Sequence, residues 1–385
     1  MMISSRTFRP IPVCAFVILG LSVSAQVQDP KVRSKVEADL YQDPTRDVAI
    51  AKTAYGDDGC FVALRTKGGQ TALGGVAQSD LGWSLQVLTT DKMSEIKHDT
   101  PKFVWGIGPV ALETIVTFNK EFRTILSKPD PANGKLLLLQ EVLSPRSLTG
   151  KAAALVAEVP FDRFGKSADY FTPGMAVGFN TTVAKDGKHM LIGLSPTGTV
   201  RTAGCPILGV MVDGKMQPQW TNTLATDPGA VHVDIVGTEV DKTGAAWYLI
   251  KNVSDPDPKT KDKLGYNFTL YRLDSAGQQA AVLDIGKEDF AQDAAFDILP
   301  DGSIVCAGIY SNGETNRNES IGIFSTALDP ATMKWGDMAK IPFDKQVVKK
   351  VERLQTNMHV EHIWPKSDGD LVVVTERSGI ETHTV

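Results

Sequence analysis

The sequence predicts an all-β protein, a β-propeller-like array of about six four-stranded blades, with seven as the alternative count. Three observations predict it: short apolar runs, tight turns between them, and a regular interval between the turns. Each run is about 6 to 8 residues long, too short for a typical helix, and most are rich in β-branched or aromatic residues. The runs are CFVALRT, KLLLLQEV, HMLIGL, ILGVMV, AAWYLI, FTLYRL, SIVCAGIY, IGIFSTAL and LVVVTE.

Turns of one chemical kind separate the predicted strands. Most are Asx-Gly pairs, whose residues tolerate the positive φ of tight hairpins. The pairs begin at Asn133, Asp186, Asp213, Asp301 and Asp368, and looser versions lie at 241–244 (DKTG) and 274–277 (DSAG). We therefore expect a mostly antiparallel chain.

Alternate turns recur at a near-constant interval. Asn133, Asp186, Asp241, Asp301 and Asp368 are separated by 53, 55, 60 and 67 residues, which suits blades of about four strands with long outer loops. A second repeated pattern supports this interval. LSPRSLTGK (143–151) and LDPATMKW (328–335) share a strand-end leucine and a proline turn, and they lie 185 residues apart. That interval is close to three blades.

The stretch LPDGSIVCAGIYSNGE (299–314) shows how one such strand is bounded. A Pro-Asp-Gly turn starts it and SNGE ends it, and the run IVCAGIY has little polar alternation. We predict a central strand that is buried on both faces, because a blade finds its missing partner in its neighbours around the ring.

Residues 1–25 have the composition of a signal peptide. Arg6 and Arg9 are followed by an apolar segment of about 14 residues and by small residues before Gln26, so we expect cleavage there. The segment is shorter than the roughly 20 residues that span a bilayer. We expect a product exported to the periplasm, the cell surface or the exterior, without a membrane span after cleavage; an uncleaved anchor is the alternative.

The mature chain is expected to hold an N-terminal segment at 26–58 and the propeller-like domain at 59–385. The chain stops about ten residues after the predicted strand LVVVTE, whereas a ring needs its last blade completed because an open edge invites association. Either VAIAKTAY (48–55) supplies the closing strand, or the array is incomplete at the C-terminus.

The charge pattern excludes two partner classes. Loss of Arg6 and Arg9 lowers the formal net charge from −5 to about −7. Because the Lys and Arg residues are scattered along the chain, we expect no concentrated positive surface that would bind nucleic acid or anionic lipid. A glycan, a peptide or an envelope protein remains as the expected partner.

Three cysteines remain after cleavage, Cys60, Cys205 and Cys306, all with apolar or small neighbours. We expect buried thiols inside strands, and one disulfide with one free thiol is the alternative. No Cys-x-x-Cys pair indicates structural zinc.

Histidines and acidic loops give no metal site. In HVEHIW (359–364), His359 and Glu361 share one face of a regular strand while His362 points to the other, so the three converge only at a bulge. The acidic loop at 254–263 lacks the ligand spacing of an EF-hand. We predict no metal and no cofactor.

Nucleophile motifs are likewise not supported. SEIK, YSN and KTG occur in the wrong order for a penicillin-recognising serine enzyme, and GLSPTG places a proline after the serine of a hydrolase elbow. We therefore predict no catalytic residue and, as the leading hypothesis, a non-enzymatic binding or scaffolding module of the cell envelope or exterior that uses one loop-lined end of the ring.

The competing hypothesis is a hydrolase or lyase acting on glycans, with carboxylates gathered at the end of the channel. Candidates are Glu113, Glu141, Asp234, Glu239, Asp297 and Glu376. Most of the six tryptophans are expected in packing, with one or two at a loop end as stacking surfaces for a sugar or peptide. N-x-Ser/Thr sequons begin at Asn180, Asn252, Asn267 and Asn318.

Together with the signal peptide, several segments between about 135 and 376 resemble the uncharacterised exported β-propeller-like proteins of bacteria. These segments are KLLLLQEVLSPRSLTGK, GVMVDGKMQPQW, DKTGAAWYLIKN, LPDGSIVCAGIYSN, GIFSTALDPATMKW and SDGDLVVVTE. The resemblance implies propeller architecture and export, and it implies no particular activity.

Overall fold

The computed structural model describes residues 48–56, 60–67, 83–92, 94–106, 108–164, 176–197, 206–254, 265–312, 320–343, 358–366 and 370–377. The predicted signal peptide, Cys205 and Asn318 lie outside these residues. The described chain is all-β apart from two 3-10 turns, Pro131–Asn133 and Phe161–Phe164. Consequently no helix in these ranges has the length and apolarity needed to cross a membrane.

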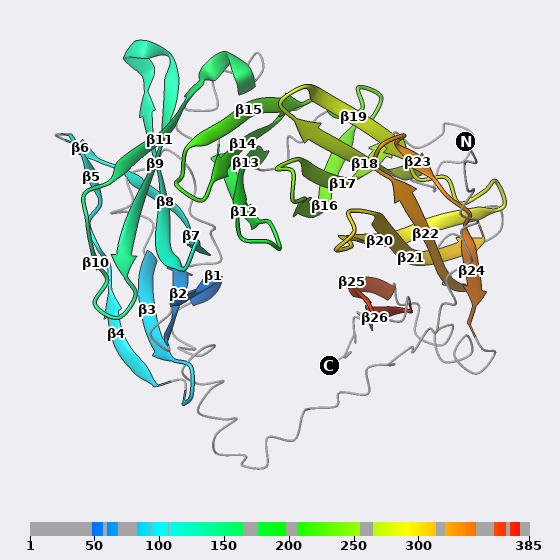
Figure 1. Ribbon diagram of the computed structural model, residues 1–385, viewed down its shortest axis with the longest axis horizontal. Helices are drawn as coiled ribbons and strands as arrows, with labels where there is room; N and C mark the ends of the chain where they lie inside the picture. The colour runs from blue at the N-terminus through cyan, green and yellow to red at the C-terminus, as the bar shows by residue number, and fades with distance from the viewer. Residues whose placement is uncertain are drawn as a thin grey trace, which may run out of the picture.

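Six antiparallel sheets follow one another around a central opening as the blades of a propeller, and the first strand of each borders the opening (Figure 1). The predicted propeller-like fold is therefore confirmed. Blade 1 consists of β1 Val48–Gly56, β2 Cys60–Lys67, β3 Trp83–Thr89 and β4 Glu95–Asp99. Blade 2 consists of β7 Ala111–Phe118, β8 Glu121–Asp130, β9 Lys135–Ser144, β10 Thr149–Gly150 and β11 Ala154–Pro160, and the ribbon β5 Val104–Trp105 and β6 Gly108–Pro109 precedes it.

The remaining blades follow the same sequential order. Blade 3 is β12 Ala176–Val183, β13 His189–Thr197, β14 Ile207–Asp213 and β15 Pro218–Leu224. Blade 4 is β16 His232–Val240, β17 Ala246–Ser254, β18 Gly265–Asp274 and β19 Gly277–Val282. Blade 5 is β20 Asp289–Ile298, β21 Ile304–Asn312, β22 Gly322–Asp329, β23 Lys334–Trp335 and β24 Ala339–Pro342. The sixth sheet is β25 Met358–Pro365 with β26 Leu371–Arg377.

The strand β1 belongs to blade 1. It pairs with β2 from Val48 opposite Lys67 to Gly56 opposite Cys60. Within the described residues β1 has no pairing with β25 or β26, and the sixth sheet has two strands there. These strand pairings therefore place residues 48–55 in blade 1, and they do not support the prediction that this segment closes the last blade.

Aspartates shape the turns between the first and second strands of blades 3, 4 and 5. The Oδ1 atoms of Asp186, Asp241 and Asp301 each accept the backbone N–H two residues further on, at 2.9, 2.8 and 2.9 Å. Glycines with φ of 70°, 78° and 93° complete these turns at 187, 244 and 302, where other residues would be strained. The recurring turn chemistry thus has one structural cause.

In blade 2, the turn assigned to the regular series is the second turn of the blade and not the first. There the turn between the first two strands is Asn119-Lys120, and both residues have positive φ, 50° and 62°. Asn133 instead ends the following connection, between β8 and β9. Taking Asn133 as the start of the series was wrong, because the first turn of blade 2, Asn119-Lys120, lacks the glycine by which the other turns were recognised.

The repeated pattern of 143–151 and 328–335 is confirmed as an equivalence of blades 2 and 5, which are three blades apart. Leu143 pairs with Gly150 across the β9–β10 turn, and Leu328 pairs with Trp335 across the β22–β23 turn. The residues just before the fourth strand, Leu148 and Met333, have φ of 55° and 54°.

The strand IVCAGIY is central and buried on both faces, as predicted. The first eight residues of β21 are all buried. Cys306 packs toward blade 4, and its neighbour Ala307 packs toward the sixth sheet. Cys60 and Cys306 are fully buried, and burial raises the pKa of the Cys306 thiol to about 12, so this thiol is chemically inert.

Candidate functional site

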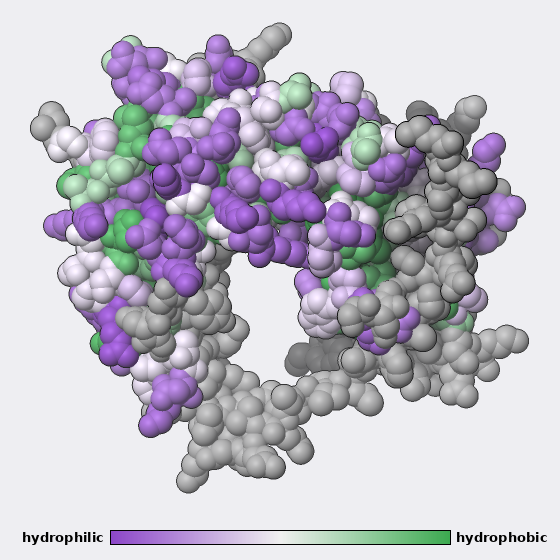
Figure 2. Space-filling model, viewed as in Figure 1, coloured by the Kyte–Doolittle hydropathy of each residue, from purple (hydrophilic) through white to green (hydrophobic). Residues whose placement is uncertain are grey.

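The turns after β12, β16 and β20 lie side by side at one end of the central opening. Gly244 lies against the His189 ring, and Gly302 lies beside Lys242 of the neighbouring turn. We call this end, where these inner strands run into their aspartate turns, the turn end. Figure 2 shows the opening from one face of the molecule, with mainly hydrophilic residues along its upper border.

A lysine at the turn end joins two blades that are not neighbours in sequence. Lys185, which follows β12, donates from Nζ to Asp297 Oδ1 of β20 and to the Ile298 carbonyl oxygen, the latter at 3.0 Å. Asp297 Oδ1 also accepts the Ile298 N–H at 2.7 Å. Since blade 4 lies between blades 3 and 5, this contact reaches across the turn end.

Glu239 on β16 of blade 4 completes the cluster. Burial and the nearby charge of Asp297 raise the pKa of the Glu239 carboxyl, and the Lys185 ammonium offsets part of this. Among the described residues no hydrogen bond reaches its carboxylate, and neither oxygen is buried without a partner. The half-buried carboxylate of Glu239 therefore has no hydrogen-bond partner in this part of the chain.

The two carboxyl groups differ in their surroundings. Asp297 is nearly buried, and its ionised form is bound by an ammonium and an amide N–H. Glu239 has no such donors, so it holds a proton more readily than an ordinary glutamate. The turn end thus presents one carboxylate that is compensated by a cation and one that is not.

An exposed aromatic residue lies at the same end. Trp364 is 53 % exposed and makes an edge contact with His362 at 4.7 Å between ring centroids. The residue before it, Ile363, packs with Val305, which pairs directly with Asp297 across the β20–β21 hairpin. Because neighbouring residues of a strand point to opposite faces, Trp364 lies on the face of β25 that is turned away from blade 5.

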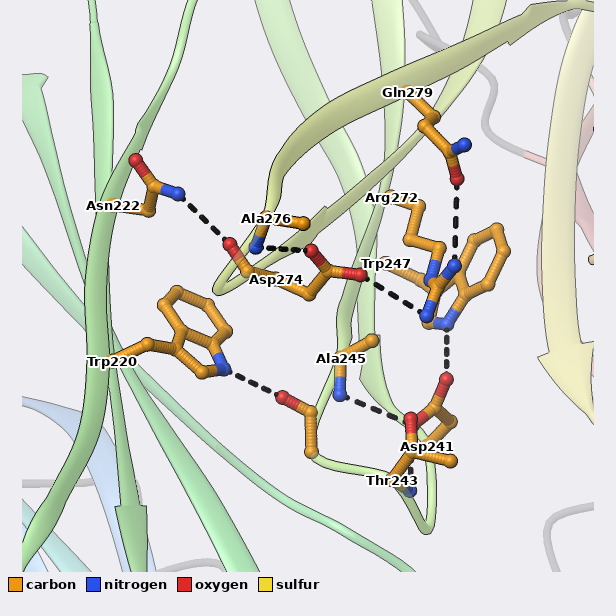
Figure 3. Close-up of polar contacts among 11 residues, drawn as sticks. Trp220, Asn222, Asp241, Thr243, Ala245, Trp247, Arg272, Asp274, Ala276 and Gln279 are labelled. Carbon is orange, nitrogen blue, oxygen red and sulfur yellow. Dashed lines mark hydrogen bonds and ion pairs between the residues drawn. The ribbon is translucent and has the colours of Figure 1, made fainter.

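The turn of Asp241 fixes the strand that carries Glu239. Asp241 Oδ1 accepts the backbone N–H of Thr243 at 2.8 Å and of Ala245 at 3.1 Å, while Oδ2 accepts the Trp247 indole N–H at 2.9 Å (Figure 3). Trp220 of blade 3 donates its indole N–H to the Gly244 carbonyl oxygen at 2.8 Å. These bonds tie blade 3 to blade 4 beside the site.

The same network extends outward from the turn. Arg272 lies over the Trp247 ring, 5.8 Å from its centroid, and pairs with Asp274 at 3.0 Å. Asn222 of blade 3 donates to the Asp274 carbonyl oxygen at 2.8 Å (Figure 3). These bonds hold blades 3 and 4 together, and none of them involves the Glu239 side chain.

The other carboxylates considered from the sequence are dispersed. Glu113 is buried in blade 2 beside Ser127, and burial raises the pKa of Glu141 on β9. Asp234 lies toward the opposite end of β16, where it pairs with His232 at 2.9 Å. The Glu376 side chain lies outside the described part. Of the six candidates, the structure brings Glu239 and Asp297 together.

The histidine cluster on β25 does contain a bulge, between Val360 and His362. His359 Nδ1 lies 3.6 Å from Asp293 Oδ2 of blade 5. Even so, in the ranges that the structure describes, no three His, Cys, Asp or Glu side chains gather as metal ligands would. Among the sequons, Asn252 is buried with its amide bonded to Asn267 and Thr269, and Asn180 and Asn267 are exposed.

Sequence reasoning missed Lys185, whose partner is 112 residues away, so that no local pattern marks it. It also did not distinguish Trp364 from the other five tryptophans. The alternation of polar and apolar residues in HVEHIW could have predicted that Trp364 shares the exposed face of the strand with His362.

Comparison with known proteins finds β-propellers among the similar solved structures. The sequence matches no family model and no curated protein. Among solved structures, it is similar to the Penicillium chrysogenum α-L-arabinanase complexed with arabinobiose, at 10% identity and a TM-score of 0.38, over 79% of this chain and 82% of that one. It is also similar to the β-propeller domain of the trilobed protease from Pyrococcus furiosus, at 8% identity and 0.34, over 86% and 89%.

A third similar structure is the Dos1 propeller, at 8% identity and a TM-score of 0.40, over 86% of this chain and 81% of that one. At such low identity and TM-score, these similarities concern the β-propeller fold alone and carry nothing about ligand or activity.

Proposed function

We propose that the protein is an exported binding protein that holds a glycan at the turn end of its propeller. The observation that carries the proposal is the convergence of Lys185, Glu239 and Asp297 from three blades. A few convergent polar groups are typical of ligand sites. Export rests on the signal-peptide pattern of residues 1–25.

Glycan chemistry suits these groups. Sugar hydroxyls donate hydrogen bonds, and the Glu239 carboxylate and the second oxygen of Asp297 are acceptors without a described donor. A polyanion such as nucleic acid is disfavoured by the acidic balance of the chain.

Calorimetric titration of the mature protein with a panel of neutral oligosaccharides tests this proposal. We expect one of them to bind, with affinity at least about tenfold lower in Asp297→Asn and in Lys185→Ala. Asp234→Asn is the matched control, because it removes a charge from β16 toward the other end and should bind as the wild type does. Equal binding by all variants would place the ligand elsewhere, and no binding by any sugar would refute glycan recognition.

A second candidate function is glycan hydrolysis, favoured by the different surroundings of the two carboxyls. Glu239, whose pKa is raised, would donate a proton to the leaving oxygen as the glycosidic C–O bond breaks. Asp297, which pairs with Lys185, would take a proton from the water that attacks the anomeric carbon. Release of reducing ends by the wild type, lost about a hundredfold or more in Glu239→Gln, is the expected result; no release would leave the binding function alone.

A further inference from the structure

A tyrosine hydroxyl is buried between blades 3 and 4 without a hydrogen-bond partner. Tyr248 lies on β17 and packs with Leu191 and Met211 of blade 3, and 1% of its surface is exposed. Among the described residues, no group bonds its hydroxyl oxygen. Burial raises the pKa of this phenol, so the hydroxyl keeps its proton. It is a donor that needs an acceptor, because a buried polar group without one is costly.

Gly193 on β13 leaves room beside this hydroxyl. Gly193 is buried, and a methyl group added to it would have as its nearest neighbours the Asn180 carbonyl oxygen at 3.8 Å, the Asn180 Cβ at 3.9 Å and the Tyr248 hydroxyl oxygen at 3.9 Å. These are ordinary van der Waals distances, so the space takes a small group without strain. Its polar border consists of an unpaired hydroxyl and a carbonyl oxygen, which can accept two hydrogen bonds.

The space lies directly behind an inner strand of the propeller. Asn180 is opposite Gly193 in the β12–β13 ladder, and β12 borders the central opening (Figure 1). On the other side of the interface, Thr238 is opposite Tyr248 in the β16–β17 ladder and has a second buried hydroxyl oxygen without a partner. Both blades therefore bring unpaired polar groups to this part of their interface.

We propose that a water molecule binds beside Gly193, where it accepts a hydrogen bond from the Tyr248 hydroxyl and donates one to the Asn180 carbonyl oxygen. Buried waters make about two to four hydrogen bonds to polar groups that lack protein partners, and a water-mediated bond is enthalpically nearly as good as a direct one. The water links the second strand of blade 4 to the inner strand of blade 3. Gly193 has no positive φ, so its role is to leave the space open.

Two substitutions test the proposal in combination. Gly193→Ala fills the space with a methyl group and expels the water, which leaves the Tyr248 hydroxyl unpaired. We expect the urea midpoint to fall and the equilibrium constant of unfolding to rise about fivefold or more. In the Tyr248→Phe protein no hydroxyl needs the water, so the same alanine should raise the midpoint, because a strand glycine is less stable than alanine. Urea unfolding of the wild type, both single variants and the double variant measures this change of sign.

The alternatives give different signs. If the space is dry, Gly193→Ala raises the midpoint in both backgrounds, and this result would overturn the proposal. If alanine lowers the midpoint in both backgrounds, its cost does not depend on the Tyr248 hydroxyl, and the proposal fails as well.

A high-resolution crystal structure gives an independent readout. We expect electron density for a water about 2.5 to 3.0 Å from both the Tyr248 hydroxyl and the Asn180 carbonyl oxygen in the wild type, and its loss in Gly193→Ala. A wild-type map without density beside Gly193 would refute the site whatever the unfolding data show.

Discussion

Glu113 lies at a bulge in β7, between Leu112 and Thr114, with its carboxyl fully inside the protein. Ser127 Oγ donates to Oε1 at 2.5 Å, and Oε2 has no partner. Burial raises the pKa of this carboxyl from 4.5 to about 8, and the Ser127 bond offsets part of the effect. Between these two values the folded protein keeps a proton that the unfolded chain releases. The free energy of unfolding therefore falls as pH rises through this range, by at most about 1.4 kcal/mol per pH unit from this group.

Glu113→Gln removes the titrating group and keeps an acceptor for Ser127, so we expect a flatter pH dependence of stability between about pH 5 and 8. Urea unfolding at several pH values measures it. Glu288→Gln, a change at an exposed glutamate in the turn before β20, should leave the slope as in the wild type. A Glu113→Gln protein with the wild-type slope would show that Glu113 is ionised when folded.

At the scale of elements, short apolar runs and Asx-Gly pairs were enough to predict the strands and most turns, because strand length and positive φ are local properties. They did not distinguish two successive turns in blade 2, since Asn119-Lys120 lacks a glycine although both residues have positive φ. They also did not show that the turn aspartates differ in their hydrogen bonds. Asp241 bonds a buried tryptophan, while the described bond of Asp186 is to one exposed N–H.

That difference predicts unequal costs for the same substitution. Asp241→Ala leaves Thr243, Ala245 and the Trp247 indole without their acceptor, and we expect a loss of about 2 to 4 kcal/mol in the free energy of unfolding. The matched Asp186→Ala in the equivalent turn of blade 3 should cost less than about 1 kcal/mol. Urea unfolding compares them, and equal losses would contradict a special role for the Asp241 network.

At the scale of the whole molecule, repeat spacing predicted a ring of blades, because each blade buries its faces only against neighbours. The site was less predictable. Six carboxylates were considered from the sequence, and which of them meet depends on how inner strands from different blades face one opening. Lys185 and Asp297 lie 112 residues apart, and the pairing of such distant side chains follows from the arrangement of the blades around the opening rather than from any local pattern.

The attachment of the sixth sheet to blade 5 gives the last prediction. Asp293 Oδ2 on β20 accepts the Val360 N–H of β25 at 2.8 Å and lies 3.6 Å from His359 Nδ1 of the same strand. β25 also lies on blade 5 through apolar contacts such as that of Ile363 with Val305. Asp293→Ala removes this bond and leaves the Val360 N–H without an acceptor, so we expect amide hydrogen exchange across β25 and β26 to accelerate at least about tenfold while blades 1 to 4 keep their protection. Asp289→Ala on the same strand, whose partner is Lys340 within blade 5, is the control and should leave β25 protected. Uniform acceleration over all blades in Asp293→Ala would instead show that the sixth sheet and the rest of the propeller unfold as one unit.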